Sequence, residues 1–291
     1  MPPTVLLFFS CYATICENMH CYACLAGYPG ERKLNFLLQG KKGIVFGVAN
    51  RHSLAWFITK ALSGAGAQLA ITYQEERFEK KLKKLMENEL DDQPLALPCD
   101  IRDDAQIESV YQRLGETFGQ LDFIIHSVAF ASREDLEGKF IHTSREGFLL
   151  AMEISVFSLA AIIKPALPLM DKGGNIVTLT YLGGQRAIPN YNVMGVAKAA
   201  LESSVRYLAA DLGEQNIRVN ALSPGLINTL SSRGIKGFSS FLDHVRQKTP
   251  LQRNIEGKEV GDAALFLCSD LSRGITGETI YVDAGYHIMG S

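Results

Sequence analysis

From Gly40 to the end of the chain, short apolar runs alternate with amphipathic stretches, and no other feature of the sequence constrains the fold as strongly. The first run, residues 43–47, is followed by a stretch, 54–65, whose apolar residues recur at i, i+4, i+7 and i+8. This is the spacing of a helix with one buried stripe. Later apolar runs lie at 68–73, 95–99, 121–126, 175–180, 217–222 and 279–283, with helical spacing between them. We therefore predict about seven strands that alternate with helices.

Strands that are apolar on both faces and separated by helices belong to a parallel sheet covered on both sides, because a helical crossover brings the next strand in parallel. The 291 residues contain no linker-like break after residue 40, and one α/β domain commonly reaches about 250 residues. We predict an α/β fold, a doubly wound parallel sheet of Rossmann type, in a single domain at 37–291. Its ligand site is expected at the carboxyl ends of the strands.

Residues 1–36 read differently from the rest of the chain. Four of the six Cys lie in the first 24 residues, and the first basic residue is Arg32. A secretory signal needs a basic start and a longer apolar stretch, and a membrane helix needs about 18 apolar residues, so neither is predicted. One alternative is a zinc site, for which the soft ligands are Cys16, His20, Cys21 and Cys24. We predict a poorly ordered leader, or a start codon placed too far upstream.

The charge balance points to a small, nearly uncharged partner. The 29 Lys and Arg and the 31 Asp and Glu give a net charge of −2, without a basic block. Recognition of nucleic acid or of an acidic membrane by bulk charge is therefore not expected. No His/Glu cluster with ligand spacing occurs in the domain, so we predict no metal. Cys99 and Cys268 lie in apolar surroundings and form no disulfide framework, which indicates the cytoplasm.

The turn after the first strand contains one glycine, Gly47, and leads through Ser53 and Leu54 into a helix. In a dinucleotide fold this turn lets backbone N–H groups approach a pyrophosphate at a helix N-terminus. Ser53 can cap the helix and donate its hydroxyl to a phosphate. By spacing alone, an ordinary strand-to-helix turn capped by Ser53 is an equal alternative.

The end of the second strand bears on the choice of cofactor. Gln74, Glu75 and Glu76 stand where a NAD site places an acid on the ribose and a NADP site places a base. Two carboxylates oppose a 2′-phosphate, so NADH is favoured over NADPH, with Arg51 as the one opposing charge. The alternative reading of the two glutamates is a solvated helix start.

The stretch from Tyr181 to Lys198 follows the fifth strand and opens a helix. Tyr191 and Lys198 are seven residues apart, nearly two turns, so both point from one helical face to the same crevice. A phenol can donate a hydrogen bond to a forming oxyanion, and an ammonium can bind cofactor hydroxyls and lower the pKa of the phenol. Outside a dinucleotide fold, the same pair is more often a packed ring and a solvated amine.

Five motifs together resemble one known family. They are Gly47-x5-Ser53-x-Ala55, residues 126–130 (HSVAF), the stretch 181–198, residues 223–229 (SPGLINT) and residues 282–285 (VDAG). From about Leu38 onward the chain is similar to the bacterial NADH-dependent enoyl-acyl-carrier-protein reductases of type II fatty-acid synthesis, a divergent branch of the short-chain dehydrogenases/reductases. The family's Tyr-x6-Lys pattern matches Tyr191 and Lys198. Carbonyl-reducing relatives use Tyr-x3-Lys, and the corresponding residue here is Gly195.

The resemblance implies transfer of a hydride from NADH to the β-carbon of a trans-2-enoyl thioester carried by acyl carrier protein. Tyr191 would hold the thioester oxygen, Lys198 the ribose hydroxyls, and Tyr181 would line the acyl site together with Ala129, where many members carry Gly. It also implies a homotetramer. The expected cofactor-binding residues are Gly47, Ser53, Leu54, Gln74, Asp100, Ile101, Ser127, Val128, Lys198, Ile227 and Thr229. The leader 1–36 has no counterpart in the family.

The segment 226–248 contains glycines and serines between apolar residues, which predicts a lid that orders over the acyl chain. The alternative for this segment is a plain surface helix. Two other functions stay open: a short-chain reductase that acts on the carbonyl of a 3-oxoacyl thioester, and a non-catalytic sensor that binds NADH on the same fold.

Overall fold

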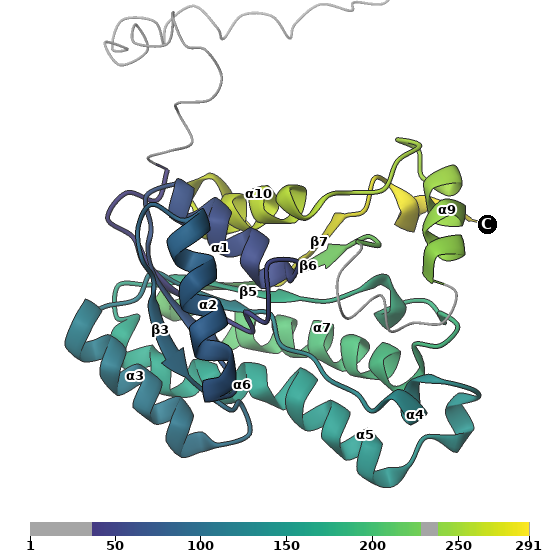
Figure 1. Ribbon diagram of the computed structural model, residues 1–291, viewed down its shortest axis with the longest axis horizontal. Helices are drawn as coiled ribbons and strands as arrows, with labels where there is room; N and C mark the ends of the chain where they lie inside the picture. The colour runs from purple at the N-terminus through teal and green to yellow at the C-terminus, as the bar shows by residue number, and fades with distance from the viewer. Residues whose placement is uncertain (1–36, 228–237, 291) are drawn as a thin grey trace, which may run out of the picture.

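Seven parallel strands form one sheet in the computed structural model, which describes residues 37–227 and 238–290 (Figure 1). The strands are β1 Lys42–Phe46, β2 Gln68–Tyr73, β3 Leu95–Pro98, β4 Phe123–His126, β5 Gly174–Leu179, β6 Ile217–Pro224 and β7 Thr279–Val282. Their order in the sheet is β3-β2-β1-β4-β5-β6-β7. The chain moves outward from β1 to β3 and returns to β4 on the other side of β1. This reversal places a ligand crevice at the carboxyl ends of β1 and β4.

Helices cover both faces of the sheet (Figure 1). The described α-helices are α1 Leu54–Gly64, α2 Glu76–Glu89, α3 Asp104–Phe118, α4 Arg133–Leu136, α5 Arg145–Met152, α6 Ser158–Ile163, α7 Asn192–Leu212, α9 Phe238–Lys248 and α10 Gly257–Cys268. One hydrophobic core contains buried residues of α1, α2 and α10, among them Leu62 and Val260. The other contains buried residues of α3, α6 and α7, among them Leu114 and Leu201.

The central strand β1 shows why these runs are apolar throughout. Val45 belongs to the core on one face of the sheet, whereas Ile44 and Phe46 belong to the core on the other. All three side chains are at most 1% exposed. Alternate side chains of a strand point to opposite faces, so a strand covered on both faces needs an apolar residue at every position.

Local side-chain chemistry sets the ends of α3. The Asp103 carboxylate accepts hydrogen bonds from the backbone N–H groups of Ala105 and Gln106, and so caps the first turn. At the other end Gly119 adopts a left-handed conformation, with φ of 73°, which glycine reaches without a steric penalty. The helix therefore starts and stops where its sequence dictates, and its buried apolar residues share a core with Leu97 of β3.

A long helical segment, Arg145–Leu169, is apolar enough to cross a membrane by length and composition. It consists of α5, a π-helical turn at Glu153–Phe157, α6 and a 3-10 helix at Lys164–Leu169. Leu159, Ile162 and Ile163 are buried in one of the two cores. Burial in this core accounts for the apolar residues of α6.

The predicted doubly wound α/β fold is confirmed, and each strand boundary falls within two residues of the predicted one. The largest difference at a strand start is at β4, which begins at Phe123. The side chain of the preceding residue, Asp122, binds the start of β1. Its carboxylate accepts hydrogen bonds from Lys41 Nζ at 2.9 Å and from the Lys42 backbone N–H at 2.8 Å. The predicted leader, residues 1–36, and its four candidate zinc ligands lie outside the described residues.

Candidate active site

The loops after β1 and β4 touch at Gly47. Its φ is +94°, and a Cβ at this position would lie 2.2 Å from the carbonyl oxygen of Ser127 and 3.3 Å from Val128 Cγ2. Only glycine combines this backbone conformation with such a close approach. Gly47, Ser127 and Val128, three of the predicted cofactor residues, therefore lie together at the switch point of the sheet.

Ser53 caps α1, as the sequence predicts. Its hydroxyl accepts from the Trp56 backbone N–H at 3.3 Å. The hydroxyl proton is donated to the carbonyl of Asn50 at 2.7 Å, within the same turn. Ser53 therefore shapes the turn in this structure, and the N-terminus of α1, where Leu54 begins the helix, is the feature that can receive a phosphate.

The predicted adenosine residues meet at the carboxyl ends of β2 and β3. Arg102 lowers the pKa of the Asp100 carboxyl group most, and the side chain of Gln74 lowers it further. Arg102 Nη2 lies 2.7 Å from Asp100 Oδ2. Ile101 is half-buried and packs against one of the cores.

The basic side chains near this end are already paired with acids. Arg51 Nη2 lies 3.3 Å from Glu89 Oε1, and Arg77 Nη2 lies 2.7 Å from Glu75 Oε1. Arg51, the charge that the sequence offers to a 2′-phosphate, is thus held by a carboxylate. This pairing is in keeping with an unphosphorylated ribose.

Tyr181 and Tyr191 pack edge to face. Their ring centroids are 4.9 Å apart, with planes at 71°, a favourable arrangement for two aromatic rings. Gly183 lies against both rings: a Cβ there would be 2.5 Å from Cδ1 of Tyr191 and 3.2 Å from Cδ1 of Tyr181. The glycine thus permits the pair to form.

Gly195 lies one turn after Tyr191, at the position where carbonyl-reducing relatives carry their lysine. A Cβ at Gly195 would lie 2.8 Å from the carbonyl oxygen of Gly183. The loop that carries Tyr181 is therefore packed directly on the backbone of α7, and a side chain at 195 does not fit without moving that loop.

Lys198 is buried, with 5% of its surface exposed, rather than solvated. Its Nζ donates to the carbonyl of Leu179 at 2.7 Å, at the end of β5. Burial lowers the pKa of Lys198 to about 8, opposed by the nearby carboxylate of Glu202. The ammonium form therefore titrates close to neutral pH.

The expectation that Lys198 lowers the pKa of the Tyr191 phenol is wrong for this structure. Burial raises the pKa of Tyr191, and the neighbouring Tyr181 raises it further. Burial likewise raises the pKa of Tyr181 to about 12. A buried phenolate is poorly solvated, so both phenols keep their protons and can donate hydrogen bonds.

Backbone strain flanks Tyr191. Asn190 and Asn192 have φ values of 59° and 25°, in a region that non-glycine residues rarely adopt. The Asn192 amide donates to the carbonyl of Gly138 at 3.2 Å, which ties this turn to the segment after α4. Strained backbone of this kind gathers at functional sites.

Sequence reasoning missed His126, the last residue of β4. Its ring nitrogens lie 2.8 Å from Thr178 Oγ1 on β5 and 2.8 Å from Ser158 Oγ on α6. Burial, and then the charge of Lys198, lower the pKa of His126 to about 3, so the ring is neutral. It fixes the strand end from which Ser127 enters the crevice. The HSVAF motif was the signal, but it draws attention to the residues after the histidine.

An apolar cluster lies beside the tyrosines. Leu226 and Val245 are buried, and Tyr181, Leu242 and Tyr286 pack against them. Because Leu242 and Val245 belong to α9, this helix lies next to Tyr181. Of the other predicted residues, Ile227 is half-buried against a core and Ala129 is exposed. Thr229 lies outside the described residues, as does part of the predicted lid, 228–237.

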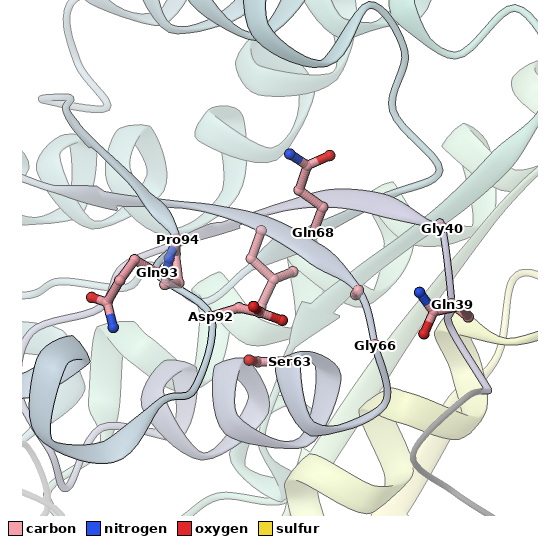
Figure 2. A pocket seen from close by; sticks show the side chains of 10 residues that line it. Gln39, Gly40, Ser63, Gly66, Gln68, Asp92, Gln93 and Pro94 are labelled. Atoms are coloured by element: carbon pink, nitrogen blue, oxygen red, sulfur yellow. The ribbon is translucent and has the colours of Figure 1, made fainter.

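A pocket of about 410 Å³ lies at the opposite end of the strands from the site, at the amino ends of the first strands (Figure 2). Gln39, Ser63, Gln68 and Asp92 are among the residues that line it. None of the predicted site residues lies there. Nor does any group of three His, Cys, Asp or Glu in 37–227 and 238–290 have a metal-binding arrangement.

The structure thus brings together a switch point at Gly47, a capped helix N-terminus, the contacting rings of Tyr181 and Tyr191, and the buried Lys198. The family model described as enoyl-(acyl carrier protein) reductase matches residues 47–287. The chain belongs to this family. The resemblance that the motifs predict is confirmed.

Similar proteins agree on the activity and differ in the cofactor. FabI of Bacillus cereus, an enoyl-(acyl-carrier-protein) reductase (NADH), is 51% identical over 254 residues, which are 87% of this chain and 99% of that protein. FabI of a Staphylococcus aureus strain, an NADPH enzyme, is 48% identical over 87% of this chain and 98% of that protein.

Solved structures match over the same region. The Bacillus cereus reductase with NADP+ and indole naphthyridinone has a TM-score of 0.86 and 51% identity, and the match covers 88% of this chain and 100% of that one. The Anaplasma phagocytophilum reductase in complex with NAD has a TM-score of 0.85 and 48% identity, over 88% and 97% of the two chains. The expected class is confirmed: an NADH-dependent enoyl-(acyl-carrier-protein) reductase of fatty-acid synthesis.

Proposed function

We propose that Tyr191 is the residue that stabilises the oxyanion formed when this reductase acts on a trans-2-enoyl thioester carried by acyl carrier protein. Reduction at the β-carbon pushes negative charge onto the thioester oxygen, which a phenol can hold by donating a hydrogen bond. Tyr191 keeps its proton because burial raises its pKa. Tyr181, in edge-to-face contact with it, fixes the orientation of the ring and lines the acyl side.

Lys198 is the proposed partner of the nicotinamide ribose. It is a buried donor, and Leu179 O, its acceptor at 2.7 Å, holds it in place beside the crevice. NADH supplies the hydride when bound. The residues proposed to bind it are Gly47, Ser53 and Leu54 for the pyrophosphate, Gln74, Asp100 and Ile101 for the adenosine, and Ser127, Val128, Ile227 and Thr229 for the nicotinamide side; Thr229 lies outside the described residues. The cradle at Gly47, which a Cβ would fill, supports this fit.

One observation favours the enoyl over the carbonyl reaction. At Gly195, where a Tyr-x3-Lys enzyme needs its lysine, a Cβ would approach the Gly183 carbonyl to 2.8 Å. This chain therefore lacks both the lysine that a 3-oxoacyl reductase needs and the space for it. The presence of Tyr181, Tyr191 and a buried Lys198 together argues against a sensor without activity.

The wall beside Tyr181 supports an acyl site under 226–248. Leu242 and Val245 of α9 already contact the cluster of Leu226, Tyr181 and Tyr286. We expect this segment to close over the acyl chain as a lid, with Ala129 at the entrance. Limited proteolysis with and without NADH tests this, and equal cutting rates within 226–248 would contradict it.

A homotetramer and a cytoplasmic location complete the proposal, with 37–291 as the reductase domain and 1–36 as a leader. Apolar side chains are exposed on two helices that pack together, α5 and α7. They include Leu149, 61% exposed, and Tyr207, 73% exposed. We propose that these exposed apolar side chains contribute to the contacts between subunits. Light scattering should give four times the chain mass of 32.0 kDa; a monomer would contradict the proposal.

The activity is tested by following NADH consumption with a trans-2-enoyl carrier thioester and with a 3-oxoacyl thioester. We expect the enoyl substrate to be reduced and the 3-oxoacyl substrate to be left nearly untouched. The same assay with NADPH should be slower. Faster reduction of the 3-oxoacyl substrate would support the carbonyl-reducing alternative, and binding of NADH without any turnover would support the sensor.

A further inference from the structure

Glu202 is a buried acid that the proposed reaction does not use. It lies on α7, four residues after Lys198, and only 6% of its surface is exposed. Its neighbours on the buried side of the helix, Leu201 and Val205, are apolar. A carboxylate in such a place is costly unless it is hydrogen-bonded and paired with a positive charge, so its partners are informative.

Both carboxylate oxygens of Glu202 accept hydrogen bonds from the loop that carries Tyr181. Oε1 accepts from Thr180 Oγ1 at 2.7 Å, and Oε2 accepts from Gln185 Nε2 at 3.4 Å. Thr180 immediately precedes Tyr181, and Gln185 follows it by four residues. Glu202 therefore holds this loop by hydrogen bonds on both sides of Tyr181.

The fit around the carboxylate is tight. A Cβ at Gly184 would lie 3.0 Å from Glu202 Oε1 and 3.0 Å from the backbone N of Ala199. The loop, the carboxylate and the backbone of α7 are thus in contact with one another. Displacement of the carboxylate would be transmitted to the loop, and through Gly183 to the two tyrosine rings.

The carboxylate also acts on the lysine one helical turn away. Residues i and i+4 are neighbours on a helix surface, and the negative charge of Glu202 favours the protonated form of Lys198. The other groups facing this region are His126, which is neutral, and the phenols of Tyr181 and Tyr191, which keep their protons. Tyr281 of β7 senses the charge of Glu202 as well. Asp283 also raises the pKa of Tyr281, and Arg186 lowers it.

We propose that Glu202 is a positioning residue with two effects: its hydrogen bonds orient Tyr181, and its negative charge, one helical turn away, assists Lys198 in binding NADH. The inference rests on the roles of Tyr181 and Lys198 proposed above. Through these two effects, Glu202 links the substrate side of the site to the cofactor side. Glu202 lies outside the five motifs on which the resemblance rests.

Three variants separate the two effects. Glu202→Gln retains an oxygen and a donor for the loop but removes the charge. Thr180→Val retains the charge and removes the donor of the 2.7 Å bond. Asp211→Asn is the matched control, because Asp211 is an exposed acid on the same helix, about 20 Å along the axis from Lys198.

The main measurement is the pH profile of kcat/KM for NADH, which reports the titration of the free enzyme. Loss of the nearby negative charge should move the alkaline midpoint of Glu202→Gln about one pH unit lower. The variant should then match the parent chain at pH 6 and fall about eightfold below it at pH 8.5. Thr180→Val should keep the midpoint and lower kcat for the enoyl thioester. Asp211→Asn should match the parent chain throughout.

An unmoved midpoint in folded Glu202→Gln overturns the charge effect, and an unchanged kcat in Thr180→Val overturns the orienting effect. A merely structural role would lower the melting temperature and leave the midpoint in place. Glu202→Asp, which keeps the charge on a shorter side chain, should keep the midpoint and lower kcat, and decides the matter if Glu202→Gln does not fold. Lys198→Ala in the same assay separates a failure of this inference from a failure of the proposed function. If NADH binding by Lys198→Ala is not weakened, the proposed role of Lys198 itself is refuted.

Discussion

Replacement of Gly183 by alanine tests the geometry of the tyrosine pair with the smallest possible change. The new Cβ would lie 2.5 Å from Cδ1 and 2.7 Å from Cε1 of Tyr191, and 3.2 Å from Cδ1 of Tyr181. Carbon atoms in contact prefer about 3.5–4.0 Å. The ring of Tyr191 must therefore move by about 1 Å away from the loop.

A displacement of about 1 Å at a reacting group costs about 100-fold in rate. We therefore expect Gly183→Ala to lower kcat/KM for a trans-2-enoyl thioester by about that factor. The affinity for NADH should stay near that of the parent chain, since the pyrophosphate turn at Gly47 is untouched. Overpacking should also lower the free energy of unfolding by about 1–3 kcal/mol.

The assay combines steady-state reduction of the enoyl thioester, NADH binding followed by fluorescence, and a thermal melt. Gly213→Ala is the matched control, because a Cβ there meets nothing within 4 Å and the backbone is in the ordinary helical region. It should leave the rate unchanged and stabilise the fold slightly. Full activity of Gly183→Ala, or an equal loss in Gly213→Ala, would refute the reasoning.

Four further predictions concern the cofactor side. Because burial lowers the pKa of Lys198 to about 8, kcat/KM for NADH should be level below that pH and fall tenfold per unit above it; a level profile to pH 10 would contradict this. Because of the same lowered pKa, the unfolded chain binds more protons than the folded chain between about pH 8 and 10.5. The contribution of Lys198 to the free energy of unfolding should therefore rise with pH across that window, which urea titration can measure. Gly47→Ala places a Cβ 2.2 Å from the Ser127 carbonyl and should weaken NADH binding at least tenfold by calorimetry, so unchanged affinity would refute the cradle. Glu75→Gln removes an acid opposed to a 2′-phosphate and should raise the NADPH-to-NADH ratio of kcat/KM about three- to fivefold, as expected for an exposed charge; an unchanged ratio would place the selectivity elsewhere.

The seven strands and the parallel, doubly wound sheet followed from the sequence because the apolar runs recur regularly and are separated by helical spacing. A parallel doubly wound sheet then leaves few arrangements. The π-helical turn at Glu153–Phe157 could not be predicted in this way, since its apolar residues continue the pattern of the helices on either side. Its form depends on tertiary contacts, such as the hydrogen bond between Ser155 Oγ and the Phe130 backbone N–H at 3.0 Å.

The candidate site was predicted where a motif carries the chemistry and missed where contact in space carries it. The seven-residue spacing of Tyr191 and Lys198 indicates their role. The hydrogen-bond partners of His126 are 52 and 32 residues away in the chain, so no local pattern indicates them. Glu202 left a weak signal, an acid within the apolar stripe of α7. The predicted direction of the pKa shift at Tyr191 was wrong, because residue spacing shows which charges are near the phenol but not how deeply the phenol is buried.

Substitution of Tyr191 by phenylalanine tests the central claim most directly. Removal of one donor to a developing oxyanion typically lowers kcat by about 100- to 1000-fold. We predict a loss of this size with the enoyl thioester, while the dissociation constant of NADH and the melting temperature stay near those of the parent chain. Undiminished turnover by Tyr191→Phe, with the fold intact, would contradict the account.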